Sequence, residues 1–284
     1  MEWEKAKNIV FIAFVVLNLG LGVLLLLEHR RYSMTPERDR NINIVLGQHN
    51  IGLYTTTMRR FPPMRPLDVS GFYYDPHELF DIFFPNQNEI ERLEPYGYVF
   101  RHGNSELRIS GPLVIFVYDT AWFGFDADHV PQITRTEAAV LTGEFINRHF
   151  PNFELDLTFE RDGGIRLVYR QVFNSRLIYL NFVEFFVTDM GIEWIEMQFG
   201  QILGYSTAPR MIFAPDEALL TFAQQARDTD ETIIILRMDM VYFQEYESLQ
   251  PGTSYPAIPA YRIFVSGNEE NTYLINAFTN QMIN

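Results

Sequence analysis

Few residue patterns in this chain have the types and spacing that catalysis or metal binding requires. The chain has no cysteine, which excludes a thiolate nucleophile, a disulfide and a Cys-ligated zinc site. His77-Glu78 begins like the zinc motif His-Glu-x-x-His, but no histidine stands four residues after His77. The six histidines never fall at metal-ligand spacing: His29, His49, His77, His102, His129 and His149. We therefore expect no metal site and no cofactor.

Nucleophilic elbows and phosphate-binding loops are also missing. The sequence contains no Gly-x-Ser-x-Gly elbow, and Gly103-Asn104-Ser105 is typical of a hairpin turn. No glycine-rich phosphate loop follows a predicted strand. These patterns predict a protein that is not an enzyme.

Acids close together in sequence are the remaining candidates for chemistry: Asp126/Asp128, Asp228/Asp230/Glu231 and Glu269/Glu270. Residues 32–284 contain 33 acids, so close pairs arise by chance and solvated turns explain them most simply. Two alternatives stay open. Residues 228–231 or 267–271 have side chains for a weak calcium site. A hydrolase with paired carboxylates would bring its two acids together only in space.

Composition limits the class of protein and its partners. The 284 residues carry 22 Lys+Arg against 36 Asp+Glu, a net charge of −14, which excludes nucleic acid as the expected partner. An apolar content of 47% is enough for a sizeable core and is unlike that of a disordered chain. The absence of cysteine suits a protein that folds outside the cell without oxidation.

Residues 9–27 predict a transmembrane helix. They read IVFIAFVVLNLGLGVLLLL, with one polar side chain and no charge. As a helix they span about 28 Å, roughly the hydrocarbon thickness of a bilayer. A core helix would need a polar face. A signal peptide would need a small-residue cleavage site, whereas residues 28–32 read EHRRY. We expect an uncleaved anchor.

Several anchor residues are candidates for contacts within the membrane. Asn18 either bonds to its own helix backbone or forms an interhelical hydrogen bond, next to Gly20 and Gly22, whose small size lets another helix approach. Phe11 and Phe14 complete the expected interaction set. At the short end of the span, the expected membrane-interface residues are Trp3, Lys5 and Lys7.

The orientation of the anchor does not follow from charge. Lys5 and Lys7 precede the span, whereas Arg30, Arg31, Arg38 and Arg40 follow it. The positive-inside rule favours a cytoplasmic large domain, but long domains are translocated largely regardless of flanking charge.

Helical and strand signals alternate after the anchor. Capping patterns at Thr35-Pro36-Glu37, Asp75-Pro76, Thr134-x-x-Glu137 and Pro215 predict helices. The third helix is expected to bury Ala138, Leu141, Phe145 and Ile146. Alternating apolar residues predict strands at 96–101, 106–110, 113–118, 153–159, 165–169, 177–187, 193–199, 233–246, 261–265 and 272–278.

This order of elements predicts an α+β fold, in which antiparallel sheets are each covered by helices. We expect a short N-terminal segment at 1–8, a transmembrane helix at 9–27 and two α+β domains at 28–125 and 134–284. The boundary between the two domains is expected near 120–133, where Asp126, Asp128 and Pro131 lie.

The first 18 residues, MEWEKAKNIVFIAFVVLN, resemble the start of the YycI family. These are membrane-anchored regulators of an essential cell-wall two-component system, and they begin with an acid-Trp-x-Lys-x-Lys segment before one apolar span. This chain differs in having Glu2 where Asp is usual and Arg in place of Lys after Lys7. The resemblance covers about thirty residues, together with the length, the acidity and the α+β order.

The C-terminal residues resemble the last hairpin of PepSY-type domains. They comprise Pro259–Val265 and Thr272–Asn280, with Asn276-Ala277-x-Thr279-Asn280 at a position where that family has Asp-Ala-x-Thr-Gly. Such hairpins occur in extracytoplasmic modules of Gram-positive surface proteins. Both resemblances imply a cytoplasmic N-terminus and an extracytoplasmic large domain.

The YycI resemblance implies a non-enzymatic, single-pass membrane regulator. Such a protein would bind a YycH-like partner and restrain a sensor histidine kinase through transmembrane and extracytoplasmic contacts. Two other functions stay open: a PepSY-like module that restrains a peptidase, and a membrane-anchored wall hydrolase that uses paired carboxylates.

Overall fold

The computed structural model describes residues 2–71, 75–85, 97–111, 113–118, 133–161, 163–198, 200–225, 232–244, 254–266 and 272–283. The chain divides into two compact units. Unit 1 comprises Met1–Met64, Arg210–Asp239 and Ile263–Asn284, and unit 2 comprises Arg65–Pro209 and Met240–Arg262. Both contain helices and antiparallel strands, so the α+β class is confirmed.

Both units are discontinuous in sequence because β11 (Ile233–Phe243) and β12 (Ser254–Val265) each pass from one unit into the other. The expected domains at 28–125 and 134–284 stay a prediction. β12 pairs with a strand almost two hundred residues earlier, at Leu67–Ser70. The expected boundary near 120–133 lies almost wholly outside the described residues.

Unit 1 combines three helices with short strands. Besides its parts of β11 and β12, its elements are α1 (Glu2–Arg31), α2 (Pro36–Gln48), β1 (Ile51–Leu53), α5 (Pro215–Gln225), β13 (Thr272–Asn276) and β14 (Met282–Ile283). β1 pairs in parallel with the start of β11, and β13 pairs with β12 and β14. The predicted C-terminal hairpin is therefore present.

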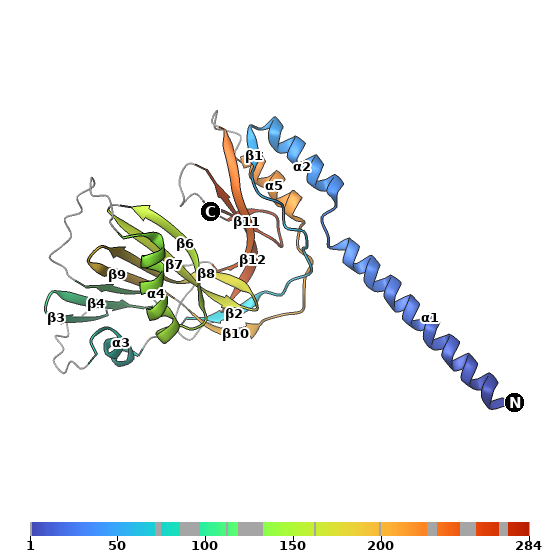
Figure 1. Cartoon of the computed structure of the whole chain (residues 1–284), viewed down its shortest axis with the longest axis horizontal. Helices are drawn as coiled ribbons and strands as arrows, with labels where there is room; N and C mark the ends of the chain where they lie inside the picture. Colours follow the sequence, from blue (N-terminus) through green and yellow to red (C-terminus); the bar gives the residue numbers. More distant parts are fainter. Residues whose placement is uncertain are drawn as a thin grey trace. The chain divides into compact units, whose positions relative to one another are not determined.

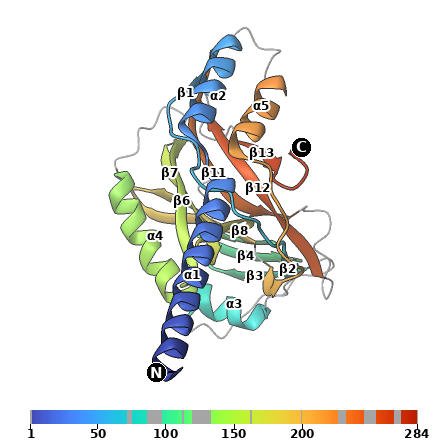
Figure 2. The ribbon, with the colours of Figure 1, turned by 90° about the vertical axis from the view of Figure 1, so that its right-hand side faces the viewer.

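Helices α2 and α5 lie side by side in unit 1 (Figures 1 and 2). α2 begins as predicted, because the Thr35 hydroxyl accepts a hydrogen bond from the Arg38 N–H at 3.3 Å and Pro36 occupies the first turn. The Arg38 guanidinium donates to both carboxylate oxygens of Asp216 on α5, at 2.7 and 2.6 Å. The apolar side chains buried by the two helices are Ile42, Leu46, Ala218, Leu219, Phe222 and Ala223.

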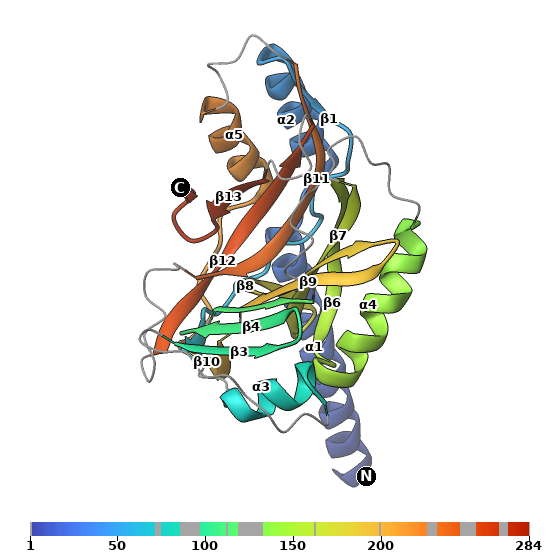
Figure 3. The ribbon, with the colours of Figure 1, turned by 90° about the vertical axis from the view of Figure 1, so that its left-hand side faces the viewer.

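Unit 2 is built on an antiparallel sheet in the order β6-β7-β8-β9-β5-β4-β3 (Figure 3). These strands are β3 (Tyr98–His102), β4 (Ser105–Ser110), β5 (Leu113–Val117), β6 (Phe153–Arg161), β7 (Gly164–Phe173), β8 (Arg176–Thr188) and β9 (Gly191–Gln198). β2 (Leu67–Ser70) pairs with β10 (Gln201–Tyr205) and β12. The end of β11 pairs in parallel with the start of β8.

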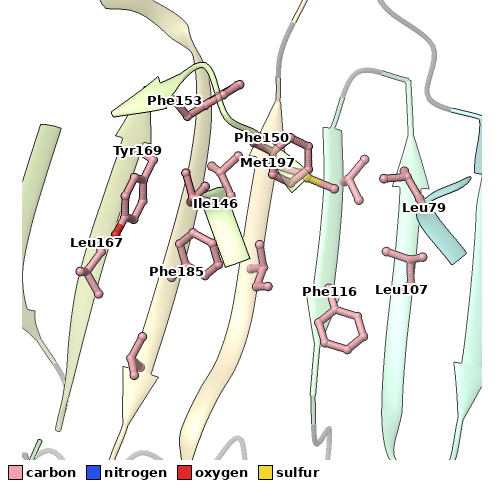
Figure 4. Close-up of a cluster of buried hydrophobic side chains, with 14 of the residues drawn as sticks. Leu79, Leu107, Phe116, Ile146, Phe150, Phe153, Leu167, Tyr169, Phe185 and Met197 are labelled. Carbon is pink, nitrogen blue, oxygen red and sulfur yellow. The ribbon is translucent and has the colours of Figure 1, made fainter. Parts of the chain in front are cut away.

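Two helices cover one face of this sheet, α3 (Pro76–Phe83) and α4 (Arg135–His149). Their apolar faces and the inward side chains of the strands form one core (Figure 4). Leu79 of α3 and Ile146 of α4 lie over Leu107, Phe116 and Phe185 of the sheet in this cluster. Burying such side chains is the main contribution to the stability of this fold.

The start of α4 confirms the predicted capping box. Thr134 Oγ1 accepts a hydrogen bond from the Glu137 N–H at 3.2 Å, and Glu137 Oε2 accepts one from the Thr134 N–H at 2.9 Å. The predicted buried stripe was wrong at Leu141, which is 39% exposed. Thr142 is buried in its place, because its hydroxyl pairs with the Ala138 carbonyl at 2.9 Å and the Tyr169 hydroxyl at 2.8 Å.

Candidate functional site

Helix α1 contains the predicted transmembrane segment. Residues Trp3–Leu25 have a mean hydropathy of 2.5, and none of that window is buried. At 1.5 Å per residue, these 23 residues reach about 34 Å, enough to cross a bilayer. A core helix with this composition would bury its side chains, whereas Phe11 and Phe14 are 66% and 64% exposed. The helix thus has the length and the exposed apolar surface of a membrane anchor.

The polar residue of the span is bonded locally. Asn18 Nδ2 donates to the Phe14 carbonyl at 2.7 Å. This is the bond to its own helix backbone, one of the two roles predicted for this residue. An asparagine amide has a second N–H and a carbonyl oxygen with further bonding capacity. A helical rotation of about 100° per residue puts Phe11, Phe14, Asn18 and Gly22 on one side. We name these four residues the Asn18 face.

Gly20 lies on the opposite side of α1, about 200° from Asn18. A Cβ atom added at Gly20 or Gly22 would meet no atom within 4 Å, so both glycines leave room for another helix. Near the N-terminal end of α1, the side chains of Trp3, Lys5 and Lys7 are exposed. Their place at a membrane surface and the interactions of the Asn18 face stay predictions.

The remaining sequence candidates for chemistry have structural explanations or fall outside the described residues. The His77 N–H donates to Asp75 Oδ1 at 2.9 Å, so this histidine belongs to the first turn of α3. Gly103 has φ of +59° in the turn between β3 and β4, as the predicted hairpin requires. Among the described ranges, no three His, Asp or Glu side chains are arranged to hold a metal ion. The acid groups at 126–128, 228–231 and 267–271 are outside these ranges.

Two carboxylates that no sequence pattern marked as a site meet in unit 2. Glu184 of β8 and Glu196 of β9 are register partners, which puts their Cβ atoms about 4.5–5.5 Å apart. Arg166 of β7 forms an ion pair with Glu184, and its guanidinium lies 5.9 Å from the ring centroid of Trp194. The sequence signal that could have indicated this pair is the single acid within the apolar run at 182–187, FVEFFV.

Burial raises the pKa of both carboxyl groups. For Glu184, whose side chain is 13% exposed, Arg166 and Arg170 oppose this rise, and Glu196 adds to it by like-charge repulsion. For Glu196, burial is again the largest cause of the raised pKa, and Arg166 opposes it. Arg166 acts on both acids but does not outweigh their burial, and the folded state favours a proton on the pair.

We predict that Glu184→Gln stabilises the protein increasingly as the pH rises from 4 to 7. The pKa of Glu184 is raised above its ordinary 4.5, so ionising this group costs stability once the pH exceeds the unfolded value. Gln carries no proton to lose, and Arg166 keeps Glu196 as a partner. Urea unfolding of both chains at pH 4, 5, 6 and 7 measures the difference in unfolding free energy. A difference that stays constant with pH contradicts the prediction.

A second polar group of unit 2 is the buried ionic cluster of Asp156, Arg170 and Arg262. Asp156 lies at a break in the β6–β7 register between Leu155 and Leu157, and such a bulge redirects a side chain. Arg262 of β12 pairs with both oxygens of Asp156, one of them at 2.8 Å, and Arg170 Nε donates to Asp156 at 2.9 Å. These bonds connect β6, β7 and β12.

The geometry of this cluster favours the ionised form of Asp156. Burial raises the pKa of Asp156, but the two guanidinium groups outweigh that effect and lower it below its ordinary value. The Arg170 guanidinium also lies 4.2 Å from the ring centroid of Tyr179. The side chains of Asp156 and Arg262 are both 0% exposed, so the cluster connects strands and is not open to a substrate.

Comparison with known proteins gives a likeness of fold. No protein-family model matches the chain, and no curated protein matches its sequence. A solved structure of an uncharacterized protein from Eubacterium rectale is similar, with a TM-score of 0.54 and 8% identity, over 83% of this chain and 91% of that one. At this identity the likeness concerns the fold alone.

Two further solved structures are similar at lower scores. The C-terminal domain of YpeB from Bacillus megaterium has a TM-score of 0.41 and 10% identity, over 75% of this chain and 96% of that one. YycH from Bacillus subtilis has a TM-score of 0.48 and 12% identity, over 80% of this chain and 57% of that one.

Proposed function

We propose that this protein is a non-enzymatic, single-pass membrane regulator that acts on a sensor histidine kinase through its anchor, together with a YycH-like partner. The observation that carries the proposal is the Asn18 face, which combines one polar residue, one glycine and two phenylalanines on an exposed apolar helix long enough to span a bilayer. The resemblance of residues 1–18 to the YycI family supplies the kinase and the partner.

The Asn18 face is suited to bind another transmembrane helix. Gly22 has no side chain, so a neighbouring backbone can approach closely at that level. The free bonding capacity of the Asn18 amide can then be used across the interface, where such bonds contribute roughly 0.6 to 2 kcal/mol. Phe11 and Phe14 extend the contact by one to two turns toward the N-terminus.

For the orientation we propose a cytoplasmic segment at 1–8 and an extracytoplasmic region after residue 27. The family resemblance supports this direction, and the length of the region permits translocation despite its flanking arginines. In this arrangement the outer region meets the YycH-like protein while α1 contacts the kinase, and the expected sign of regulation is restraint.

Affinity purification of the full-length chain from its own membranes tests the proposal. We expect a sensor histidine kinase and a YycH-like protein to accompany the wild type and the Gly20→Leu variant, whose change lies opposite the Asn18 face. Asn18→Leu and Gly22→Leu should lose the kinase. Recovery of a peptidase in its place would favour the PepSY-like alternative, and equal kinase recovery with all four chains would contradict a role for the Asn18 face.

The Glu184–Glu196 pair supports a second candidate function, a membrane-anchored hydrolase of wall polysaccharide. Two neighbouring carboxyl groups beside an aromatic ring are the side chains that such chemistry employs, and a raised pKa suits the one that acts as general acid. Release of wall fragments by the purified protein, abolished by both Glu184→Gln and Glu196→Gln, would favour the hydrolase. If the purified wild type releases no wall fragments, the result favours the regulator over the hydrolase.

A further inference from the structure

Positive charge in this acidic chain is concentrated directly after the membrane-spanning segment. Residues 28–66 carry seven arginines and three acids, a net charge of +4. Residues 67–284 carry 13 arginines and 31 acids, a net charge of −18. The sequence alone spreads these arginines over almost forty positions, so it does not indicate a common surface.

The fold of unit 1 brings two pairs of arginines together at the C-terminal end of α1. Ser33, just after the helix, forms an antiparallel bridge with Arg60. The Met34 N–H donates to the Arg59 carbonyl at 2.9 Å, and the Phe61 N–H donates to the Tyr32 carbonyl at 3.0 Å. Arg60 thereby lies opposite Ser33, two residues after Arg31, and Arg59 lies opposite Met34. The side chains of all four arginines at this end of α1 are exposed.

Aromatic contacts hold this junction in place. The rings of Tyr32 and Phe61 meet edge to face, with 6.5 Å between their centroids, and Phe61 is only 6% exposed. The Arg31 guanidinium lies 5.7 Å from the Tyr32 ring centroid. A tyrosine at the end of an apolar span is typical of the headgroup layer of a membrane.

The position of the arginines along the helix agrees with that layer. The apolar window ends at Leu25, and Arg31 follows six residues later, about 9 Å further along the axis. The headgroup region of one leaflet is roughly 5 to 8 Å deep, so Arg31 lies at its outer edge. A guanidinium binds a phosphate through two parallel hydrogen bonds, so four of them suit a surface of lipid phosphates.

We propose that Arg30, Arg31, Arg59 and Arg60, which we name the arginine collar, bind the headgroups of anionic phospholipids in the bilayer that α1 spans. The inference rests on the membrane anchoring proposed above, but not on its orientation or on a kinase. The collar would hold unit 1 at the membrane surface although most of the chain is acidic and repelled from it.

Native mass spectrometry of the full-length chain tests the collar. The protein is released from nanodiscs made of equal parts phosphatidylglycerol and phosphatidylcholine, and the lipids that stay bound are counted. We expect the wild type to retain phosphatidylglycerol in preference to phosphatidylcholine. Each arginine near an anionic membrane surface contributes about fivefold, so Arg59→Gln/Arg60→Gln should reduce this preference about 20- to 30-fold. The matched control, Arg135→Gln/Arg148→Gln, removes two exposed arginines of α4 and should keep the preference.

Five further outcomes decide the proposal. A wild-type preference that survives 0.5 M NaCl, or an equal loss in the control, would overturn it, and the salt measurement does not depend on any variant being folded. Displacement of the lipid by 10 mM inorganic phosphate would also overturn it, because the site would then bind free phosphate. A chain that enters nanodiscs without lipid preference overturns the collar alone, whereas one that stays out overturns the anchor as well.

Discussion

Asp156→Asn is expected to lower the free energy of unfolding by about 3 to 5 kcal/mol, the usual effect of removing one partner from a buried ion pair. The Arg262 side chain is 0% exposed and would lose the carboxylate that it binds through two nitrogens. Arg170, 9% exposed, would lose the negative charge that its Nε hydrogen bond faces. Urea unfolding of the full chain in detergent, followed by tryptophan fluorescence, measures the change.

The matched control for Asp156 is a surface pair of the same unit. Glu160 also lies on β6 and pairs with Arg135 at 3.1 Å, but these side chains are 59% and 50% exposed. Glu160→Gln should therefore change the free energy of unfolding by at most about 1 kcal/mol. Equal and small effects of Asp156→Asn and Glu160→Gln would show that the buried ionic cluster contributes no more than a surface ion pair.

The contribution of Asp156 should also depend on pH, in the direction opposite to that of Glu184. Its pKa in the folded protein is lowered below the ordinary 3.8, so the stabilisation is complete above that value. It is lost as the pH falls through the lower, folded pKa. The difference in unfolding free energy between the wild type and Asp156→Asn should thus shrink below about pH 3.8.

Replacing residues 9–27 by an unrelated apolar span is expected to abolish regulation while the rest of the chain stays folded. Nothing in the apolar window of α1 is buried, so the exchange removes no core contact. The regulatory effect, by contrast, would depend on helix contacts that favour one of two kinase conformations. A bias of about 1 to 3 kcal/mol corresponds to a 5- to 150-fold change in output.

A graft provides the matched control for this exchange. An artificial leucine-rich span that carries only Phe11, Phe14, Asn18 and Gly22 at their own positions should restore regulation, whereas the same span without them should not. Kinase output is read from a reporter of the two-component system, and folding from near-ultraviolet circular dichroism. Regulation that persists with the plain span would mean that the extracytoplasmic region carries the signal.

Features that depend on neighbouring residues could be predicted from the amino-acid sequence. The anchor can be predicted because nineteen consecutive, mostly apolar residues without a charge have few stable alternatives to a membrane-spanning helix. The starts of α2, α3 and α4 are readable because a cap is a contact between residues two or three positions apart, as at Thr134 and Glu137. The α+β class follows from the order of such local signals.

Contacts between residues far apart in the chain are visible only in the folded protein. Asp156 and Arg262 are 106 positions apart, and their pairing depends on a bulge in β6 together with the placement of β12. Glu184 and Glu196 become neighbours through the register of β8 and β9, and Arg60 reaches Ser33 through a bridge formed after a loop. A local sequence pattern does not predict such contacts, because the register and order of the strands depend on how the whole core packs. For the same reason the two compact units do not follow the order of the sequence.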